Sequence, residues 1–135
     1  MEEEDQTFQQ AIEALARKDG RYDPDAYYFL RESLDATYRD LSEKAGSPVF
    51  RHVSAAELLD GFRKLALDEF GPLALLVLET WGIARTQDIG RMVFNLISAG
   101  VFGKDEDDRL SDFDDVFDFH EAFALPYEVP ETPES

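Results

Sequence analysis

A chain of 135 residues is long enough to bury one hydrophobic core and too short for two independent domains of ordinary size. Hydrophobic residues make up 44% of it, including 11 Phe, 5 Tyr and 1 Trp, a composition that excludes an intrinsically disordered chain. No cysteine is present, which excludes disulfides, thiolate metal sites and a cysteine nucleophile.

The formal net charge of −17 is concentrated at the two ends of the chain. Residues 2–5 carry four acids and no base, residues 104–135 carry twelve acids and two bases, and the stretch between them is nearly balanced. Acidic ends repel nucleic acids and anionic membranes, because binding to phosphates requires clustered Lys and Arg. We therefore expect a protein partner with a basic surface, and neither nucleic acid nor membrane. An acidic start and the lack of a long apolar run also predict a cytoplasmic protein.

Two amphipathic helices are expected in the first third of the chain. Apolar residues recur at spacings of three and four from Phe8 to Leu15, and this pattern stops at Asp19-Gly20. Asp23-Pro24 is typical of a helix start, with an acidic cap and proline in the first turn. The apolar stripe that follows predicts a second helix, which ends near Ala45-Gly46.

Three more helices are expected between residues 54 and 100. Ser54-Ala55-Ala56-Glu57 is a capping box, which predicts the start of the third helix. Phe70-Gly71-Pro72 ends that helix and begins a fourth, from about Leu73 to Trp81, which is apolar nearly all round and should therefore be the most buried. Thr86 is expected to cap a fifth amphipathic helix, which ends at Gly100.

The chain changes character after Gly100, because aromatic and acidic residues alternate between Arg109 and Phe119. This alternation favours a β-hairpin with residues 104–108 as its turn. Helical spacing of Phe113, Val116 and Phe117 leaves a helix as the alternative.

These elements predict a mostly α-helical single domain over residues 6–125, between an acidic tail at 1–5 and a flexible, Pro-rich acidic tail at 126–135. Three helices followed by a hairpin have the order of a winged helix-turn-helix, here over residues 54–120. Residues 86–99 would then form its recognition helix. A plain five-helix domain with an irregular acidic C-terminal segment is the alternative.

A DNA-binding transcription regulator is the second functional hypothesis. The fifth helix offers Arg85, Gln87, Arg91 and Asn95, which are residue types that read base edges. The expected wing, however, carries four consecutive acids at 105–108, which have the wrong sign for a phosphate backbone. We therefore favour a protein-binding domain over a DNA-binding one.

No metal site or cofactor is expected. The acids from Asp112 to Asp118 do not follow the calcium-loop pattern, which requires glycine at its sixth position and glutamate at its twelfth. His52 and His120 are the only histidines, and neither has a second metal-ligand pair at a suitable spacing. An enzyme with a site near Arg51-His52 is a further alternative. The hydroxyl of Ser54, the nearest nucleophile, is already expected to cap a helix.

The sequence thus indicates a non-enzymatic interaction or regulatory module, for which a C2 homodimer is a reasonable default. The number of aromatic residues exceeds what a small core easily buries, so some of them should mark an interface. The candidate interaction residues are Arg51, His52, Trp81, Arg85, Arg91, Asn95, Phe113, Phe117 and Phe119.

A set of short motifs extends over residues 8–123. They are Asp19-Gly20-Arg21-Tyr22, Ala26-Tyr27, Arg51-His52-Val53-Ser54, Glu57-Leu58-Leu59, Phe70-Gly71-Pro72, Trp81-Gly82-Ile83, Val93-Phe94-Asn95-Leu96 and Val116-Phe117-Asp118-Phe119. In this combination the chain resembles a family of small proteins from planctomycetes and verrucomicrobia whose activity is not established. The resemblance implies a single domain of bacterial origin, and it implies no site residues.

Overall fold

The computed structural model describes residues 2–128. This part of the chain is mostly helical and contains no β-strand, which confirms the predicted helical fold class. Its five α-helices are α1 (Glu2–Lys18), α2 (Pro24–Ala45), α3 (Ala55–Phe70), α4 (Ala74–Thr80) and α5 (Thr86–Ser98).

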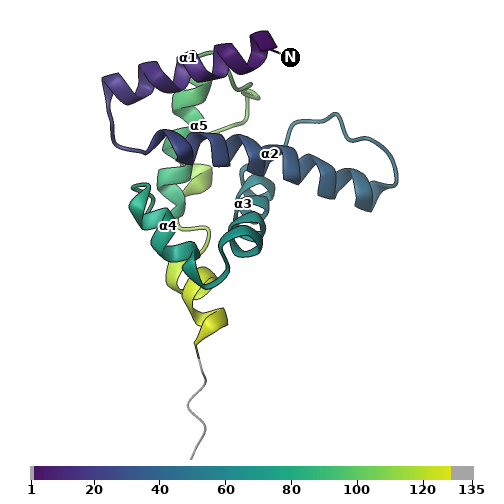
Figure 1. The fold of residues 1–135 in the computed structure, drawn as a ribbon. Coiled ribbons are helices and arrows are strands. Elements are labelled where there is room, and N and C mark those ends of the chain that lie inside the picture. Colours follow the sequence, from purple (N-terminus) through teal and green to yellow (C-terminus); the bar gives the residue numbers. More distant parts are fainter. Residues whose placement is uncertain (1, 129–135) are drawn as a thin grey trace, which may run out of the picture.

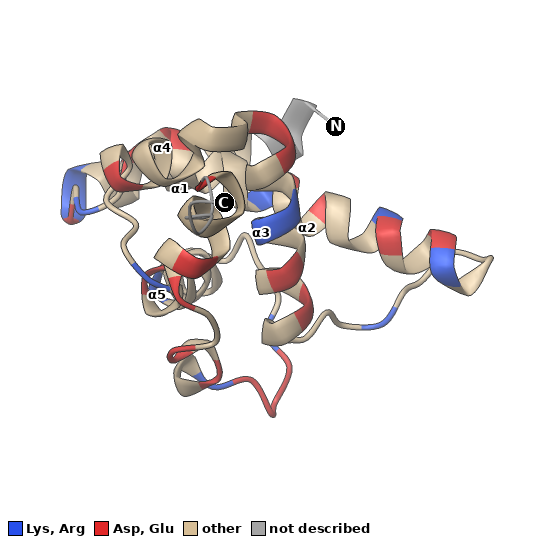
Figure 2. Cartoon of the chain, turned by 90° about the horizontal axis from the view of Figure 1, so that it is seen from below, with Lys and Arg blue, Asp and Glu red and all other residues tan. Residues whose placement is uncertain are grey.

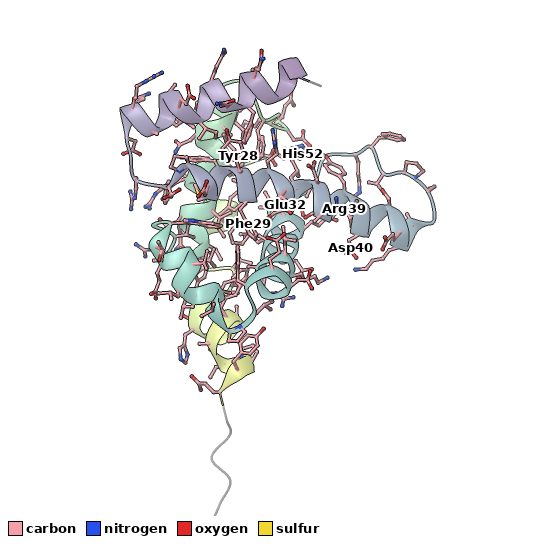
Figure 3. All side chains as sticks on the ribbon, in the orientation of Figure 1. Tyr28, Phe29, Glu32, Arg39, Asp40 and His52 are labelled. Carbon is pink, nitrogen blue, oxygen red and sulfur yellow. The ribbon has the colours of Figure 1, made fainter. Side chains whose placement is uncertain are left out.

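Helix α2 crosses the centre of the molecule, and its C-terminal half projects beyond α3 (Figure 1). Its first half lies between α1 on one side and α3 and α4 on the other. Figure 3 shows Tyr28 on the side of α2 that faces α1, whereas Phe29 lies on the opposite side. Ring contacts agree with this division, since Tyr28 meets Phe8 of α1 and Phe29 meets Phe62 of α3.

One hydrophobic core joins α2, α3 and α5 to the C-terminal segment. Gly61 allows α2 and α3 to pack closely, because a Cβ atom at this position would overlap the hydroxyl of Thr37. The largest apolar side chains that are fully buried are Ile12, Leu30, Leu59, Phe62, Leu78, Ile83, Ile89, Met92, Leu96 and Phe123.

The start and end signals of the second and third helices were predicted correctly. Asp23 caps α2 by accepting a 2.9 Å hydrogen bond from the backbone N–H of Asp25, and Gly46 ends this helix at a φ of 71°. Both bonds of the capping box are present in α3. The Ser54 hydroxyl accepts from the Glu57 N–H at 3.1 Å, and the Glu57 carboxylate accepts from the Ser54 N–H at 3.0 Å.

Helix α1 begins at Glu2, so residues 2–5 belong to the helix and do not form the expected tail. A helix N-terminus carries a partial positive charge, which favours acidic residues in its first turn. The same sequence that indicated a tail is therefore also a good first turn.

Helix α4 is not the most buried helix, contrary to the prediction. Its buried residues are Ala74 and Leu78, whereas Leu76 is 60% exposed, as is Leu73 just before the helix. A seven-residue helix at the edge of the domain has only one face against the core, so apolar residues on its other face stay in contact with solvent.

Thr86 does not cap α5. The capping acceptor is Asp88, whose Oδ2 atom accepts the backbone N–H groups of Ala84 at 2.9 Å and Arg85 at 3.2 Å. The Thr86 hydroxyl instead donates to the carbonyl oxygen of Phe113 at 2.6 Å and accepts from the Val116 N–H at 3.1 Å. A longer-range contact thus replaces the local cap.

The predicted C-terminal β-hairpin is absent, and with it the winged-helix fold. Leu110–Phe113 forms a 3-10 turn, and a π-helical turn at His120–Ala124 leads into a second 3-10 turn at Leu125–Tyr127. Phe113 packs on α5 at Gly90, where a Cβ atom would lie 2.6 Å from the Phe113 Cβ. Residues 114–118 are not helical, so the helical alternative for Phe113, Val116 and Phe117 is not observed either, and contacts with α5 hold this segment. Most of the expected C-terminal tail lies outside the described residues.

Candidate functional site

A cavity of about 340 Å³ opens between α1, α2, α3, α5 and the segment that follows α5. Val53, Val101, Phe102 and Phe113 line it from the connecting segments. The apolar lining residues that lie within helices are Phe8, Leu34, Ala55, Leu58, Val93, Phe94 and Ile97. Its volume and apolar walls are typical of small-ligand pockets. We call this cavity the apolar pocket.

Aromatic contacts hold α1 against the rest of the pocket wall. The ring of Phe8 meets Tyr28 edge to face at 5.4 Å between centroids and approaches Phe102 at 6.4 Å. The guanidinium of Arg31 lies over the Phe8 ring at 4.4 Å, a distance at which a cation is attracted to an aromatic face. The pocket therefore depends on α1 and on the segment after α5 as well as on the central helices.

A histidine and an aspartate lie at the mouth of the apolar pocket. The Nε2 atom of His52 lies 2.6 Å from Oδ2 of Asp108, and both side chains are partly exposed. The same Oδ2 atom accepts the backbone N–H of Asp105 at 2.8 Å, which holds the carboxylate in place. This pair connects the start of α3 to the acidic loop that follows α5.

An acidic depression of about 430 Å³ adjoins the pocket, and we call it the vestibule. Asp105, Asp107, Asp108 and Asp112 line it, together with residues 54–56 and His52. Figure 2 shows the loop after α5 as a red stretch, with a blue position at each end, that projects from the edge of the molecule. The site thus has an apolar interior and an acidic outer part.

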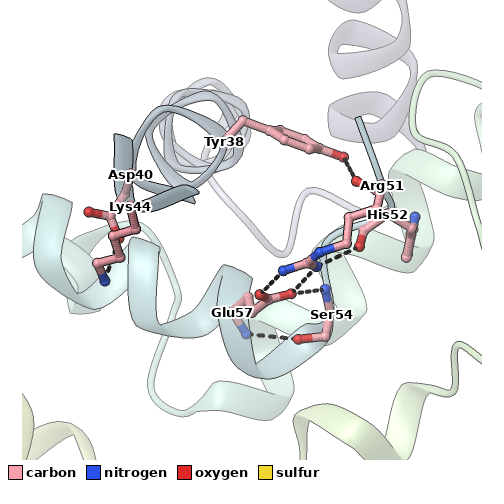
Figure 4. A network of polar contacts seen from close by, with 7 residues as sticks. All are labelled: Tyr38, Asp40, Lys44, Arg51, His52, Ser54 and Glu57. Atoms are coloured by element: carbon pink, nitrogen blue, oxygen red, sulfur yellow. Dashed lines mark hydrogen bonds and ion pairs between the residues drawn. The ribbon is translucent and has the colours of Figure 1, made fainter. Parts of the chain in front are cut away.

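Arg51 positions the residues before α3 and does not line the apolar pocket. Its guanidinium donates to both carboxylate oxygens of Glu57, at 2.8 and 2.7 Å, and to the carbonyl of His52 at 3.2 Å (Figure 4). The Tyr38 hydroxyl donates to the Arg51 carbonyl at 3.1 Å. Hydrogen bonds from Arg51 and from Ser54 lower the pKa of Glu57 to about 2. The two residues of the predicted Arg51-His52 site therefore have different surroundings: His52 lines the pocket, whereas Arg51 bonds Glu57 outside it.

Asp88 is a buried carboxylate that joins the loop before α2 to the start of α5. Besides the two backbone N–H groups, it accepts the hydroxyl of Tyr22 at 2.7 Å and lies 3.1 Å from the Arg91 guanidinium. Burial raises its pKa, but these hydrogen bonds and charges outweigh burial, so the pKa lies below its ordinary value. Burial of the Tyr22 phenol and its hydrogen bond to Asp88 raise the pKa of Tyr22 to about 12.

The polar residues of α5 that could read DNA are largely engaged within the protein. Arg91 pairs with Asp88, the Gln87 amide donates to Asp115 at 2.8 Å, and the Asn95 amide donates to the Tyr27 hydroxyl at 3.1 Å. Arg85 is exposed, and its backbone N–H is bonded to Asp88. These contacts leave little of α5 for base edges.

The aromatic residues named as candidate interaction residues pack within the fold. Trp81 lies against Phe29 and Phe70, with ring centroids 5.5 and 5.6 Å away. Phe113 and Phe119 are buried, and Phe117 is partly buried against Phe119 and Phe123. Phe113 is the one of these that lines the apolar pocket.

In residues 2–128, no hydrogen bond joins the histidine at the pocket to a nucleophilic side chain. A carboxylate beside a histidine is the orienting half of a nucleophilic site, but the histidine must also contact the attacking group. Ser54 lines the same pocket, yet within residues 2–128 its hydroxyl bonds the Glu57 N–H and makes no bond to His52. In the same residues, no group of three carboxylate or histidine side chains could hold a metal ion.

Sequence reasoning identified His52 and Phe113 but missed the pocket that they share. The sequence pattern indicated only that Phe8 and Ile97 are core residues at helical spacing and that Phe102 lies in a turn. Asp108 was one of four acids in a predicted turn. Nothing in the sequence indicated that it contacts His52, which lies fifty-six residues earlier. Only the course of the segment after α5 brings these residues together.

No family model, curated protein or solved structure matches the chain. The resemblance described above therefore stays a prediction, and the function is argued from the site alone. In the part of the chain that the structure describes, no helix has the length and apolar character needed to cross a membrane.

Proposed function

We propose that the protein is a non-catalytic binding module and that the apolar pocket is its ligand site. The observation that carries the proposal is an open cavity of about 340 Å³ with eleven apolar side chains in its walls. A folded core normally closes around such side chains, because close packing is favourable. An apolar group that enters the cavity would restore these contacts.

The pocket is built from elements that other contacts already hold in place. Phe113 is fixed on Gly90 and Thr86, Phe8 is fixed on Tyr28, and the loop before Ser54 is fixed by Arg51. A ligand therefore meets a formed site and need not order it, which favours binding. Transfer of one Leu or Phe side chain from water into such a pocket would contribute about 1.5–3 kcal/mol.

A binding role fits the chemistry of the site better than catalysis. Most of its lining side chains are apolar, and in residues 2–128 the His52–Asp108 pair at its mouth makes no hydrogen bond to a nucleophilic side chain. The contacts of Arg91, Gln87 and Asn95 within the fold argue against a DNA-binding role for α5. Cytoplasmic location and homodimerisation stay predictions.

Calorimetry with indole, a neutral apolar probe, tests the proposal. Gly103 lines the pocket, and a Cβ atom there would meet no heavy atom within 4 Å, so Gly103→Phe adds a ring at the pocket without a clash at Cβ. Ser98→Phe adds the same ring at an exposed position of α5 outside the pocket lining and serves as the control. We expect Gly103→Phe to weaken indole binding about tenfold or more, and Ser98→Phe to leave it unchanged. An unmodified protein that does not bind indole would refute the proposal.

A further inference from the structure

We infer that the natural occupant of the apolar pocket is a basic polypeptide segment. It inserts one apolar side chain into the pocket and places Lys or Arg residues over the vestibule. This inference rests on the proposed function, because it names the partner of the same pocket. Three observations support it: the pocket and vestibule share lining residues, the charge of the vestibule is complementary to a basic segment, and two exposed apolar side chains lie close in sequence to lining residues.

Continuity of the two depressions follows from the residues that they share. Both are lined by His52, Ser54, Ala55, Asp108 and Asp112. A ligand whose apolar group fills the pocket can therefore extend its polar part into the vestibule. The polar part of that ligand will meet the side chains of the vestibule.

The charge of the vestibule selects a cation. Four carboxylates line it, and His52 is the only basic side chain among its lining residues. Arg31 and Arg109 line the pocket itself, where the guanidinium of Arg31 already lies over the Phe8 ring. Charged groups at an interface favour partners of opposite charge and speed their encounter, and the net charge of −17 acts in the same direction.

Exposed apolar side chains close in sequence to residues of the site favour a polypeptide over a small amine. Phe50 is 91% exposed and lies two residues before His52, and Leu110 is 45% exposed and follows Arg109 directly. Arg109 and His52 line the pocket, so Leu110 directly follows a lining residue and Phe50 is separated from one by Arg51 alone. A small molecule that fills about 340 Å³ would leave them uncovered, whereas a segment of several residues could cover them.

Selection from a random peptide display library against the full-length protein tests the inference. Peptides that are also retained by Gly103→Phe are removed, so those that remain depend on the pocket. We expect the remaining sequences to share a large apolar residue with Lys or Arg within a few positions of it. Their affinity for unmodified protein should fall as salt concentration rises.

Two triple variants with equal charge change test the vestibule directly. Asp105→Asn, Asp107→Asn and Asp112→Asn together remove three vestibule charges and keep an acceptor oxygen in each side chain. Asp68→Asn, Glu79→Gln and Glu121→Gln remove three exposed charges that line neither depression. We expect the vestibule variant to weaken binding of a selected basic peptide about tenfold or more, and the control variant to weaken it by less than about threefold.

Each other outcome identifies what has failed. Pocket-dependent peptides without basic residues, or with acidic ones, would overturn the inference, as would equal effects of the two triple variants. Indole binding that Gly103→Phe blocks, with no pocket-dependent peptide selected, would also overturn it and would leave a small molecule as the occupant. In each of these cases the proposed function stands. Failure of the unmodified protein to bind indole at the pocket would refute the proposed function itself, and the inference with it.

Discussion

The hydroxyl of Tyr22 donates a 2.7 Å hydrogen bond to Oδ1 of Asp88, which lies 66 residues further along the chain. Asp88 in turn accepts the backbone N–H groups of Ala84 and Arg85, so one buried carboxylate fixes both the loop before α2 and the start of α5. A Cβ atom at Gly82 would lie 2.6 Å from the Arg21 carbonyl, which shows how closely these two segments approach. The orientation of α5, and with it one wall of the pocket, depends on this junction.

Tyr22→Phe should lower the free energy of unfolding by about 1–2 kcal/mol, because it removes one hydrogen bond from a buried carboxylate. Urea unfolding at neutral pH measures this effect. In an Asp88→Asn background the same substitution should cost less, since a neutral amide accepts a weaker bond. Equal costs in the two backgrounds would show that Tyr22 acts by packing alone.

Stability at high pH should depend on Tyr22. Burial and the bond to Asp88 raise the pKa of this phenol from 10.0 to about 12, so the folded state favours the protonated form. The resulting stabilisation is complete below about pH 10 and is lost as the pH rises from 10 to 12. Between pH 10 and 12, the free energy of unfolding should fall more steeply with pH for the unmodified protein than for Tyr22→Phe. Parallel curves for the two proteins would contradict this assignment.

Gly90→Ala should destabilise the protein by about 1–3 kcal/mol, although alanine favours a helix. The added Cβ atom would lie 2.6 Å from the Phe113 Cβ and would displace the segment that covers α5. Hydrogen exchange should then accelerate at the Val116 N–H, which bonds Thr86. Gly103→Ala, where no atom lies within 4 Å of the new Cβ, is the control and should change neither quantity.

Glu57 should titrate near pH 2 in the folded protein, and its pKa should rise toward its ordinary value of 4.5 in the Arg51→Gln variant while staying below it, because the bond from the Ser54 N–H remains. Because the folded-state pKa is lowered, the stabilisation is present above about pH 4.5 and is lost as the pH falls toward 2. NMR of the Glu57 carboxyl carbon follows the titration. A midpoint that stays near 2 in the variant would assign the shift to the Ser54 backbone N–H, which the substitution leaves in place.

Duplex DNA should not be retarded by the protein, even at low salt. Three of the four polar side chains expected on the recognition face of α5 are bonded within the fold, and the loop after α5 is acidic. Gel shift with random-sequence duplexes measures this. Retardation that Arg91→Ala abolishes would restore the DNA-binding hypothesis.

Local signals in the sequence predicted the helices well, since their causes lie within a few residues. Asp23, Gly46 and Ser54-Glu57 act through hydrogen bonds or backbone angles at the helix ends, and each lies at the boundary that it predicted. Thr86 shows the limit of this reasoning. It has the chemistry of a cap, but Phe113, 27 residues later, offers its hydroxyl a buried acceptor.

The apolar pocket could not be predicted in the same way, because residues from five segments create it. Alternating aromatic and acidic residues after Gly100 suggested a strand, yet Phe113 fits against Gly90 and draws the segment onto α5. The seven-residue length of α4 likewise left Leu76 exposed where the apolar sequence suggested burial. The fit between Phe113 and Gly90 and the small area of α4 that meets the core determined these two outcomes. The periodicity of apolar residues contains information on neither.

The most direct measurement of the binding site is a methyl-resolved NMR titration of the full-length protein with indole. Val53 and Ile97 line the apolar pocket, whereas Leu73 and Leu76 are exposed apolar residues at α4 and serve as internal controls. If the pocket binds apolar groups, the methyl signals of Val53 and Ile97 will shift and saturate together while those of Leu73 and Leu76 stay in place. Shifts confined to Leu73 and Leu76, or no saturable shift at all, would contradict the assignment of the pocket as the binding site.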